Sequence, residues 1–256
     1  MKEPKGKINS YTSLIQWFLE SKNIVVFTGA GMSTESGIPD FRSPEGIWSR
    51  YDLMEYGTIE AFLSNPKTVW KFFIELYNMA KDAKPNLGHH YLVKLENFKR
   101  KQAPNASFII ITQNIDSFHQ EAGSSKVIEL HGNGKEVVCM NCRRVYPFDS
   151  IDINSLPPTC PHCSSLLKVN AILFGESLPM RAFSEARKAV ENSDLLLVLG
   201  TSLEVSPANT LVLSSKGKKV LINLSKTPYD HYFDAIIYSK ISDALEKMVN
   251  LIDASD

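Results

Sequence analysis

The chain has 256 residues, 43% of them hydrophobic, and its 28 basic residues balance its 28 acidic ones. This length suits one large α/β core with a small appended module, and the absence of a basic excess argues against direct nucleic-acid binding. No apolar run approaches the ~20 residues that cross a bilayer, and no signal peptide opens the chain, so we expect a soluble, cytoplasmic protein without a membrane partner. The sequence makes no prediction of oligomeric state.

Short apolar runs rich in β-branched residues alternate with segments of helical spacing. The predicted strands are residues 24–27, 108–111, 127–130, 195–199 and 220–222. The predicted helices are residues 11–19, 67–79, 89–98 and 183–191. This alternation predicts an α/β fold with a doubly wound, Rossmann-like parallel sheet.

Two long segments interrupt this alternation. Residues 43–57 contain Pro and Ser and lead into an aromatic-rich segment, which together are long for one crossover and indicate a helical insertion. The second insertion carries the cysteines. We predict a large nucleotide-binding domain and a small module built from both insertions, with the large domain at 1–44, 85–134 and 168–256, the helical insertion at 45–84 and the ribbon insertion at 135–167.

A glycine turn follows the first predicted strand, Thr28-Gly29-Ala30-Gly31-Met32-Ser33-Thr34, and precedes a predicted helix start. Such a turn suits a diphosphate, because glycines allow close approach and a helix N-terminus supplies free N–H groups. It is not the dehydrogenase fingerprint: the next glycine is Gly37, and no strand near Asp52 supplies the acidic ribose clamp. A bare GxG also marks ordinary tight turns, but its position after an apolar strand favours nucleotide binding.

An arginine and an aromatic residue lie just beyond this turn, in Gly37-Ile38-Pro39-Asp40-Phe41-Arg42. We expect this loop to fold over a bound dinucleotide. Taken alone, Arg42 is also typical of a surface charge and Phe41 of a core residue.

Polar residues end each of the later predicted strands. The second strand ends in Thr112-Gln113-Asn114-Ile115-Asp116, although Asn and Asp are also ordinary turn residues. The third ends at His131, a candidate general base. The fourth ends in Gly200-Thr201-Ser202 and the fifth in Asn223. Because ligands bind at the carboxyl ends of parallel strands, these residues predict one binding site at that edge.

The four cysteines form two pairs, Cys139-x-x-Cys142 and Cys160-x-x-Cys163. Two such turns can place four thiolates tetrahedrally around one structural Zn²⁺. A redox CxxC or two disulfides are the alternatives, but redox CxxC motifs come singly and nothing indicates secretion. His162 is an alternative ligand, although four thiolates already complete the site.

Seven motifs in a fixed order make the sequence similar to the sirtuins, the NAD-dependent protein-lysine deacylases, over about residues 15–250. They are Gly-Ala-Gly-x-Ser at 29–33, Gly-Ile-Pro-Asp-Phe-Arg at 37–42, Thr-Gln-Asn-Ile-Asp at 112–116, His-Gly at 131–132, the two CxxC pairs, Phe-Gly-Glu at 174–176 and Gly-Thr-Ser at 200–202. Each motif is weak alone, but the ordered set is specific.

The resemblance implies that NAD, consumed as a co-substrate, lies across the carboxyl edge of the sheet. The turn at 29–31 would hold the diphosphate with Arg42 and Ser202. Asn223 would contact the adenosine ribose, and a C-terminal loop near Ile241 the adenine. The implied cofactor-binding residues are Gly29, Ala30, Gly31, Ser33, Thr34, Asp40, Phe41, Arg42, Gln113, Ile115, Asp116, Gly200, Thr201, Ser202, Asn223 and Ile241.

The resemblance also implies the chemistry. Gln113 and Asn114 would hold the nicotinamide ribose, and Ile115 and Asp116 the carboxamide of nicotinamide. The acetyl-lysine oxygen would attack the ribose carbon as nicotinamide leaves, giving an alkylamidate. His131 would act as the base that helps a ribose hydroxyl attack that intermediate, so that free lysine and acyl-ADP-ribose form. Asn114 and His131 are therefore the implied catalytic residues.

Acetylated proteins or peptides are the implied partners. The substrate backbone would pair as a strand between Phe174-Gly175-Glu176 and Leu203-Glu204-Val205. Phe41 would shield the reacting carbon from water. The Val at 169 departs from the family's usual Arg-Pro-Asn pattern near this groove. Tyr77-Asn78-Met79-Ala80 lacks the arginine of members that prefer succinyl or malonyl lysine, which favours a neutral acyl group.

Two other readings stay open. A mono-ADP-ribosyltransferase would use the same NAD site but pass ADP-ribose to a protein nucleophile. A non-catalytic zinc-ribbon module would read nucleic acid or protein, but between Cys139 and Cys163 the ribbon has only Arg143 and Arg144 as basic residues.

Overall fold

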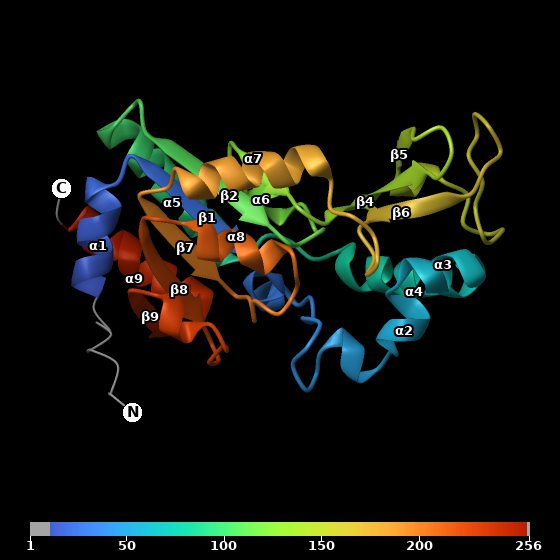
Figure 1. Cartoon of the computed structure of the whole chain (residues 1–256), viewed down its shortest axis with the longest axis horizontal. Coiled ribbons are helices and arrows are strands. Elements are labelled where there is room, and N and C mark those ends of the chain that lie inside the picture. The colour runs from blue at the N-terminus through green and yellow to red at the C-terminus, as the bar shows by residue number, and fades with distance from the viewer. Residues whose placement is uncertain (1–10, 255–256) are drawn as a thin grey trace.

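A computed structural model describes residues 11–254, so the first ten and last two residues of the predicted large domain lie outside the described part (Figure 1). A six-stranded, entirely parallel sheet has the order β3-β2-β1-β7-β8-β9. Its strands are β1 Asn23–Thr28, β2 Ser107–Thr112, β3 Val127–Glu129, β7 Leu195–Leu199, β8 Lys218–Asn223 and β9 Ala235–Tyr238. The Rossmann-like fold class is confirmed, and β9 is a strand that the sequence analysis missed.

Helices cover both faces of this sheet (Figure 1). One face packs against α1 Tyr11–Glu20, α5 Leu87–Gln102 and α9 Ile241–Asp253, and the other against α7 Met180–Glu191 and α8 Ala208–Ser214. The side chains of β1 alternate between the two cores, Val26 toward the first and Val25 toward the second. A strand buried on both faces needs the continuous apolar run that the sequence shows.

The strand order reverses between β1 and β7, which lie side by side at the centre of the sheet. From β1 the chain proceeds outward through β2 and β3, and from β7 it proceeds the other way through β8 and β9. A ligand-binding crevice forms at the carboxyl ends of strands where the order reverses. The glycine turn after β1 and the Gly200 turn after β7 therefore meet at this point.

A second, smaller body is built from the two insertions (Figure 1). It contains an antiparallel sheet in the order β5-β4-β6, with β4 Gly132–Cys139, β5 Val145–Pro147 and β6 Leu167–Ala171. Its helices are α2 Leu53–Tyr56, α3 Ile59–Ser64 and α4 Pro66–Ala80.

A third apolar core joins the helical insertion to the ribbon. Trp70 of α4 is buried and donates its indole N–H to the carbonyl oxygen of Leu167 at 2.9 Å, and its ring contacts Phe148. The helical segment and the ribbon therefore pack directly against each other. Between residues 11 and 254, no helix combines the length and the apolar character that crossing a bilayer demands.

Candidate functional site

A cavity of about 460 Å³ lies between the carboxyl edge of the large sheet and the smaller body. It is lined by many of the residues that the sequence singled out: Ala30, Ser33, Phe41, Arg42, Gln113, Asn114, Ile115, Asp116, His131, Phe174, Gly175, Glu176 and Val205. Residues more than 170 positions apart in the chain thus converge on one space.

The glycine turn packs directly against the turn after β7. A Cβ on Gly29 would lie 2.7 Å from Cβ of Thr201, and one on Gly31 would lie 2.9 Å from Cα of Gly200. Only glycine fits these two positions. The amide of Gly29 donates to Leu199 and that of Gly31 to Gly200, at 3.1 and 2.9 Å.

The predicted helix start after this turn is wrong. Residues Ala30–Met32 and Thr34–Ser36 form two short 3₁₀ turns, and no longer helix follows them before α2. The amides of both turn glycines are already bonded to the β7 side. The turn therefore allows the backbones after β1 and β7 to approach closely, and it does not form a helix N-terminus.

Asn114 is held by hydrogen bonds on three sides. Its side-chain amide donates to the carbonyl oxygen of Gly29 at 3.1 Å and to the hydroxyl oxygen of Ser33 at 3.2 Å. Its backbone N–H donates to Oγ1 of Thr112 at 3.0 Å. The side chain is therefore fixed between the ends of β1 and β2 before any ligand binds.

Asp116 lies next to this network. Its carboxylate accepts from the Ser33 hydroxyl at 2.6 Å and from the backbone N–H of Phe118 at 2.9 Å. Burial raises the pKa of Asp116, and these two hydrogen bonds act in the opposite direction. An acceptor so placed can receive an amide N–H of a ligand.

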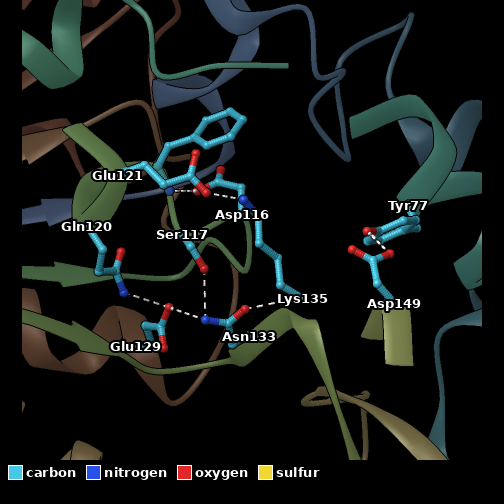
Figure 2. Close-up of polar contacts among 10 residues, drawn as sticks. Tyr77, Asp116, Ser117, Gln120, Glu121, Glu129, Asn133, Lys135 and Asp149 are labelled. Atoms are coloured by element: carbon cyan, nitrogen blue, oxygen red, sulfur yellow. Dashed lines mark hydrogen bonds and ion pairs between the residues drawn. The ribbon is translucent and has the colours of Figure 1, made fainter. Parts of the chain in front are cut away.

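The loop that carries Asp116 is tied to the start of β4. Figure 2 shows the side-chain amide of Asn133 donating to Ser117 and to Glu129, at 2.8 and 3.1 Å. The backbone N–H of Gly134 donates to the carbonyl oxygen of Ile115 at 2.7 Å. These contacts hold the Ile115–Asp116 wall of the cavity in place.

His131 follows β3 and faces the cavity. Its Nδ1 lies 3.1 Å from the carbonyl oxygen of Gln113, and because a carbonyl only accepts, Nδ1 carries the proton. Nε2 of the neutral ring is then unprotonated. Burial lowers the pKa of His131, and the positive charge of Arg42 lowers it further, against the opposing Gln113 hydrogen bond. The ring is thus a neutral base at physiological pH.

Two hydrogen bonds and an ion pair connect the 203–205 loop to residues around the carboxyl edge of the sheet. Thr201 Oγ1 accepts from the side-chain amide of Gln113 and from the backbone N–H of Leu203, both at 3.1 Å. Arg42 forms an ion pair with Glu204 at 3.6 Å. The position of this loop therefore depends on the residues at the ends of β2 and β7.

Several predicted cofactor residues lie beside the cavity and do not line it. They are Gly29, Gly31, Thr34, Asp40, Gly200, Thr201, Ser202, Asn223 and Ile241. Asp40 shapes its own loop, because its carboxylate accepts from the backbone N–H groups of Arg42 and Ser43. Asn223 donates to the carbonyl oxygen of Ser225 at 2.8 Å.

Ile241 is the first residue of α9, which corrects the expectation of a C-terminal loop there. Its side chain contacts the turn at Gly200. The sequence analysis missed Glu35, whose carboxylate accepts from the backbone N–H of Ser242 at 3.1 Å and also from its hydroxyl. No local sequence signal connects residues so far apart.

The Phe174-Gly175-Glu176 loop is held on its small-body side. The backbone N–H of Phe174 donates to Gly57, and its carbonyl oxygen accepts from Ile59, both at 2.9 Å. Gly175 adopts φ +88, and a Cβ there would lie 3.1 Å from the Glu60 carboxylate. This leaves Gly175 to present its backbone to the groove.

Glu176 points its carboxylate into its own loop. It accepts from Nζ of Lys168 at 3.0 Å and from the backbone N–H of Leu173 at 2.8 Å. Lys168 is buried and also donates to the carbonyl oxygen of Ala171 at 2.6 Å. Glu176 therefore stabilises the conformation of its own loop. The sequence analysis did not identify its partner Lys168.

The far end of the cavity is apolar and aromatic. It is lined by residues of α4 and of the ribbon: Phe72, Phe73, Leu76, Tyr77 and Phe148. The ring of Tyr77 stacks on Phe148 with centroids 4.1 Å apart, and its hydroxyl donates to Asp149 (Figure 2). This hydrogen bond is the main reason that the pKa of Tyr77 rises to about 12.

The four cysteines meet in the small body, away from the cavity lining. Their sulfur atoms all lie within 4.8 Å of one another, with Cys139–Cys163 at 3.5 Å and Cys142–Cys160 at 3.7 Å. A tetrahedral Zn²⁺ with ~2.3 Å bonds places its sulfur ligands ~3.8 Å apart. The cluster therefore fits one zinc ion with four protein ligands, and His162 is not part of it.

Comparisons with known proteins agree with this geometry. The Sir2 family model matches residues 29–207. An NAD-dependent protein deacetylase of Caldivirga maquilingensis is 41% identical over 237 residues, which cover 90% of this chain and 89% of the relative. An NAD-dependent protein deacylase of Aquifex aeolicus is 40% identical, with 91% of this chain and 97% of the relative covered.

Solved structures give the same result. A Sir2 homologue in complex with NAD superimposes with a TM-score of 0.86 at 35% identity, covering 95% of this chain and 94% of the other. A Sir2 complex with a p53 peptide and NAD⁺ has a TM-score of 0.84 at 36% identity, covering 96% and 99%. The extent of these matches and the family-model hit show that the chain belongs to the Sir2 family.

Proposed function

We propose that this protein removes acetyl, or other neutral acyl, groups from protein lysine side chains with NAD as co-substrate. The products are nicotinamide, O-acyl-ADP-ribose and free lysine. The observation that carries the proposal is His131, whose Nε2 is free to accept a proton in a cavity bounded by both the cofactor loops and the substrate loop. The names of the relatives, NAD-dependent protein deacetylases and a deacylase, support it.

The strand ends hold the cofactor in this proposal. The turn at 29–31, of which Ala30 lines the cavity, is proposed to hold the diphosphate, and Arg42 reaches it once it leaves Glu204. The buried acceptor Asp116 receives the carboxamide N–H of nicotinamide. The remaining predicted cofactor residues are proposed in the same roles as the family resemblance implies.

Bound NAD supplies a ribose carbon that becomes electrophilic as nicotinamide departs. Asn114, fixed by Gly29 and Ser33, orients the ribose beside the entering acyl oxygen. His131 accepts a ribose hydroxyl proton at Nε2, and its resulting charge is stabilised through Nδ1–H on the Gln113 carbonyl oxygen. Phe41, at the cavity wall, keeps water from the reacting carbon.

The apolar end of the cavity receives the acyl group. Its lining contains no arginine near Tyr77, and the lysine that lines it there, Lys81, is exposed to solvent, so an acyl carboxylate would lose its hydration without a buried partner. Lys135, also on the cavity wall, is already paired with Glu121. Neutral acyl groups are therefore the proposed substrates, presented by an acylated protein or peptide whose backbone pairs at Gly175 and at the 203–205 loop.

The zinc ion has a structural role, because four cysteines fill its coordination sphere and none of them lines the cavity. We also propose the division into a large domain, a helical insertion and a ribbon at the boundaries that the sequence predicts, and a location in the cytoplasm.

The test is to incubate the purified protein with an acetyl-lysine peptide, with and without NAD, and to follow peptide mass and nicotinamide together. The proposal predicts one nicotinamide released for each acetyl group removed, and no reaction without NAD. Nicotinamide release with an unchanged acetyl peptide and ADP-ribose added to protein would establish a mono-ADP-ribosyltransferase instead. If the protein does not turn over NAD at all, the non-catalytic zinc-ribbon binding module becomes the preferred function.

A further inference from the structure

Two histidines are completely buried behind the cofactor side of the cavity and line no part of it. His89 of α5 is 0% exposed and His119 of α6 (Phe118–Ala122) is 1% exposed. Their ring centroids lie 4.9 Å apart. The nitrogen atoms of a buried imidazole normally form hydrogen bonds, because a buried donor or acceptor without a partner lowers stability.

The bonds that these rings do make fix which nitrogen carries the proton. The backbone N–H of Asn86 donates to Nδ1 of His89 at 3.2 Å, so the proton of neutral His89 is on Nε2. The hydroxyl of Thr28 donates to Oγ1 of Thr112 at 2.8 Å. Thr28 Oγ1 lies 3.0 Å from Nε2 of His119. Because the hydroxyl proton of Thr28 is already donated to Thr112, Thr28 Oγ1 accepts the proton of Nε2. The other nitrogen of His119, Nδ1, is then an acceptor.

The two remaining ring atoms complement each other. Among the described residues, Nε2–H of His89 and Nδ1 of His119 have no protein partner. One is a donor and the other an acceptor, on adjacent rings.

The result is a chain of contacts that leads to Thr112, whose Oγ1 accepts both from the Thr28 hydroxyl and from the backbone N–H of Asn114. It starts at Asn86, whose side-chain amide also donates to the carbonyl oxygen of Met32 at 2.8 Å and to Ser36 at 3.1 Å, in the loop after the glycine turn. It ends at the backbone N–H of Asn114 on Thr112. In order, its members are Asn86, His89, His119, Thr28, Thr112 and Asn114, and the two histidines are joined by their ring contact.

We propose that this chain is a positioning relay: His89 and His119 set Asn114 against the cofactor turn through Thr28 and Thr112. The inference rests on the proposed function, because Asn114 is there the residue that orients the ribose. Thr28 is the residue directly before Gly29, and Asn114 bonds to Gly29, so a shift in the relay moves both sides of the ribose site.

Thr28→Val tests the relay, because it keeps the shape of the side chain and removes the hydroxyl that joins His119 to Thr112. We expect kcat to fall about tenfold and KM for NAD to rise, since small misplacements at a reacting group are costly. The matched control is Ser193→Ala, which removes another buried hydroxyl, bonded to Ser215 at 3.1 Å near the opposite end of the sheet. It should lower the thermal midpoint by a similar amount and leave both kinetic constants unchanged.

His119→Leu and the double variant His119→Leu/Thr28→Val complete a double-mutant cycle, in which kcat is measured for each protein. If the histidine acts through Thr28, the double variant is no slower than the worse single one, and His119→Gln, whose amide can donate to Thr28, recovers part of the rate. Kinetic constants within twofold of wild type for Thr28→Val, or losses that simply add, would overturn the relay.

A spectroscopic readout does not depend on turnover. In ¹⁵N-histidine NMR spectra, His89 and His119 should both appear as neutral Nε2–H tautomers in the folded protein. An Nδ1–H tautomer at either ring would contradict the relay even if deacetylation is established, whereas correct tautomers in a protein that does not deacetylate would reject the proposed function alone.

Discussion

The two ends of the cavity are built differently. At the end formed by β1 and β2, hydrogen bonds fix Asn114, Ser33 and Asp116 before any ligand binds. At the other end, the rings of Tyr77 and Phe148 and their neighbours provide an apolar wall. Hydrogen bonds fix atoms at set distances, whereas apolar packing fixes only shape and volume. Under the proposed function, the polar end would determine the chemistry and the apolar end would determine which acyl group enters.

Zinc removal should have the largest effect, because the ribbon packs against α4, which carries most of the apolar end, and leads through β6 into the Phe174–Glu176 loop. Cys160→Ser, or a strong chelator, should abolish the near-UV signal of the small body and NAD-dependent turnover together. Zinc content, circular dichroism and activity on the same sample check this. Full turnover in zinc-free protein would contradict a ribbon that supports the site.

Asp116→Ala tests the polar end. Loss of this partly buried acceptor should lower kcat/KM for NAD by about 100-fold, which corresponds to ~2.7 kcal/mol. KM for the peptide should change little. Glu121→Gln is the control, since Glu121 lies nearby but pairs with Lys135 and bonds to no atom of Asp116 (Figure 2). If both variants behave alike, the carboxylate of Asp116 has no specific role.

Lys168→Met tests how the substrate loop is held between the two ends. The variant leaves the partly buried Glu176 carboxylate with only the Leu173 amide as a partner, so KM for the peptide should rise about tenfold while KM for NAD stays unchanged. Lys168→Arg keeps the charge and should recover most of the affinity. If KM for NAD rises instead, the Lys168–Glu176 ion pair supports cofactor binding, which would contradict this prediction.

Ala80→Arg tests the apolar end by supplying a cation three residues after Tyr77. The ratio of succinyl to acetyl turnover should increase about tenfold, because an acyl carboxylate then gains a bidentate guanidinium partner, which the neighbouring Lys81 does not supply. Competition between the two peptides in one reaction, followed by mass, measures the ratio. An unchanged ratio would mean that the acyl group does not reach Tyr77.

The smallest expected effect is on pH dependence. Burial and Arg42 place the pKa of His131 below its ordinary value of 6.5. Because only the neutral ring accepts a proton, activity should be constant at neutral pH and should decline only as the pH falls below 6.5. A rate profile of kcat/KM for the peptide gives the midpoint, and a midpoint above 6.5 would contradict a buried base at this position.

The sequence predicts the large sheet and the polar end well. Five strands and the residues that follow them carry strong local signals, apolar runs and ligand-type turns, and parallel topology brings those turns together. The zinc ligands are equally local, since each CxxC pair is one short turn.

Other parts of the site have no local signal. The bonds of Lys168 to Glu176 and of Glu35 to Ser242 depend on tertiary approach, the second across 207 positions. In the sequence, the aromatic residues of α4 that line the cavity indicate only the apolar face of a helix. The expected helix after Gly31 fails because both turn amides bond to the β7 side and only 3₁₀ turns follow.

The most direct test of the account compares nicotinamide exchange with deacetylation in His131→Ala. Because His131 acts on the ribose hydroxyl after nicotinamide has left, the account predicts that the variant still exchanges labelled nicotinamide into NAD in the presence of acetyl peptide. Its deacetylation should fall by about 10²–10⁴-fold, the usual worth of a general base. Equal loss of both reactions, in a variant that binds NAD normally, would contradict the role of His131 as that base.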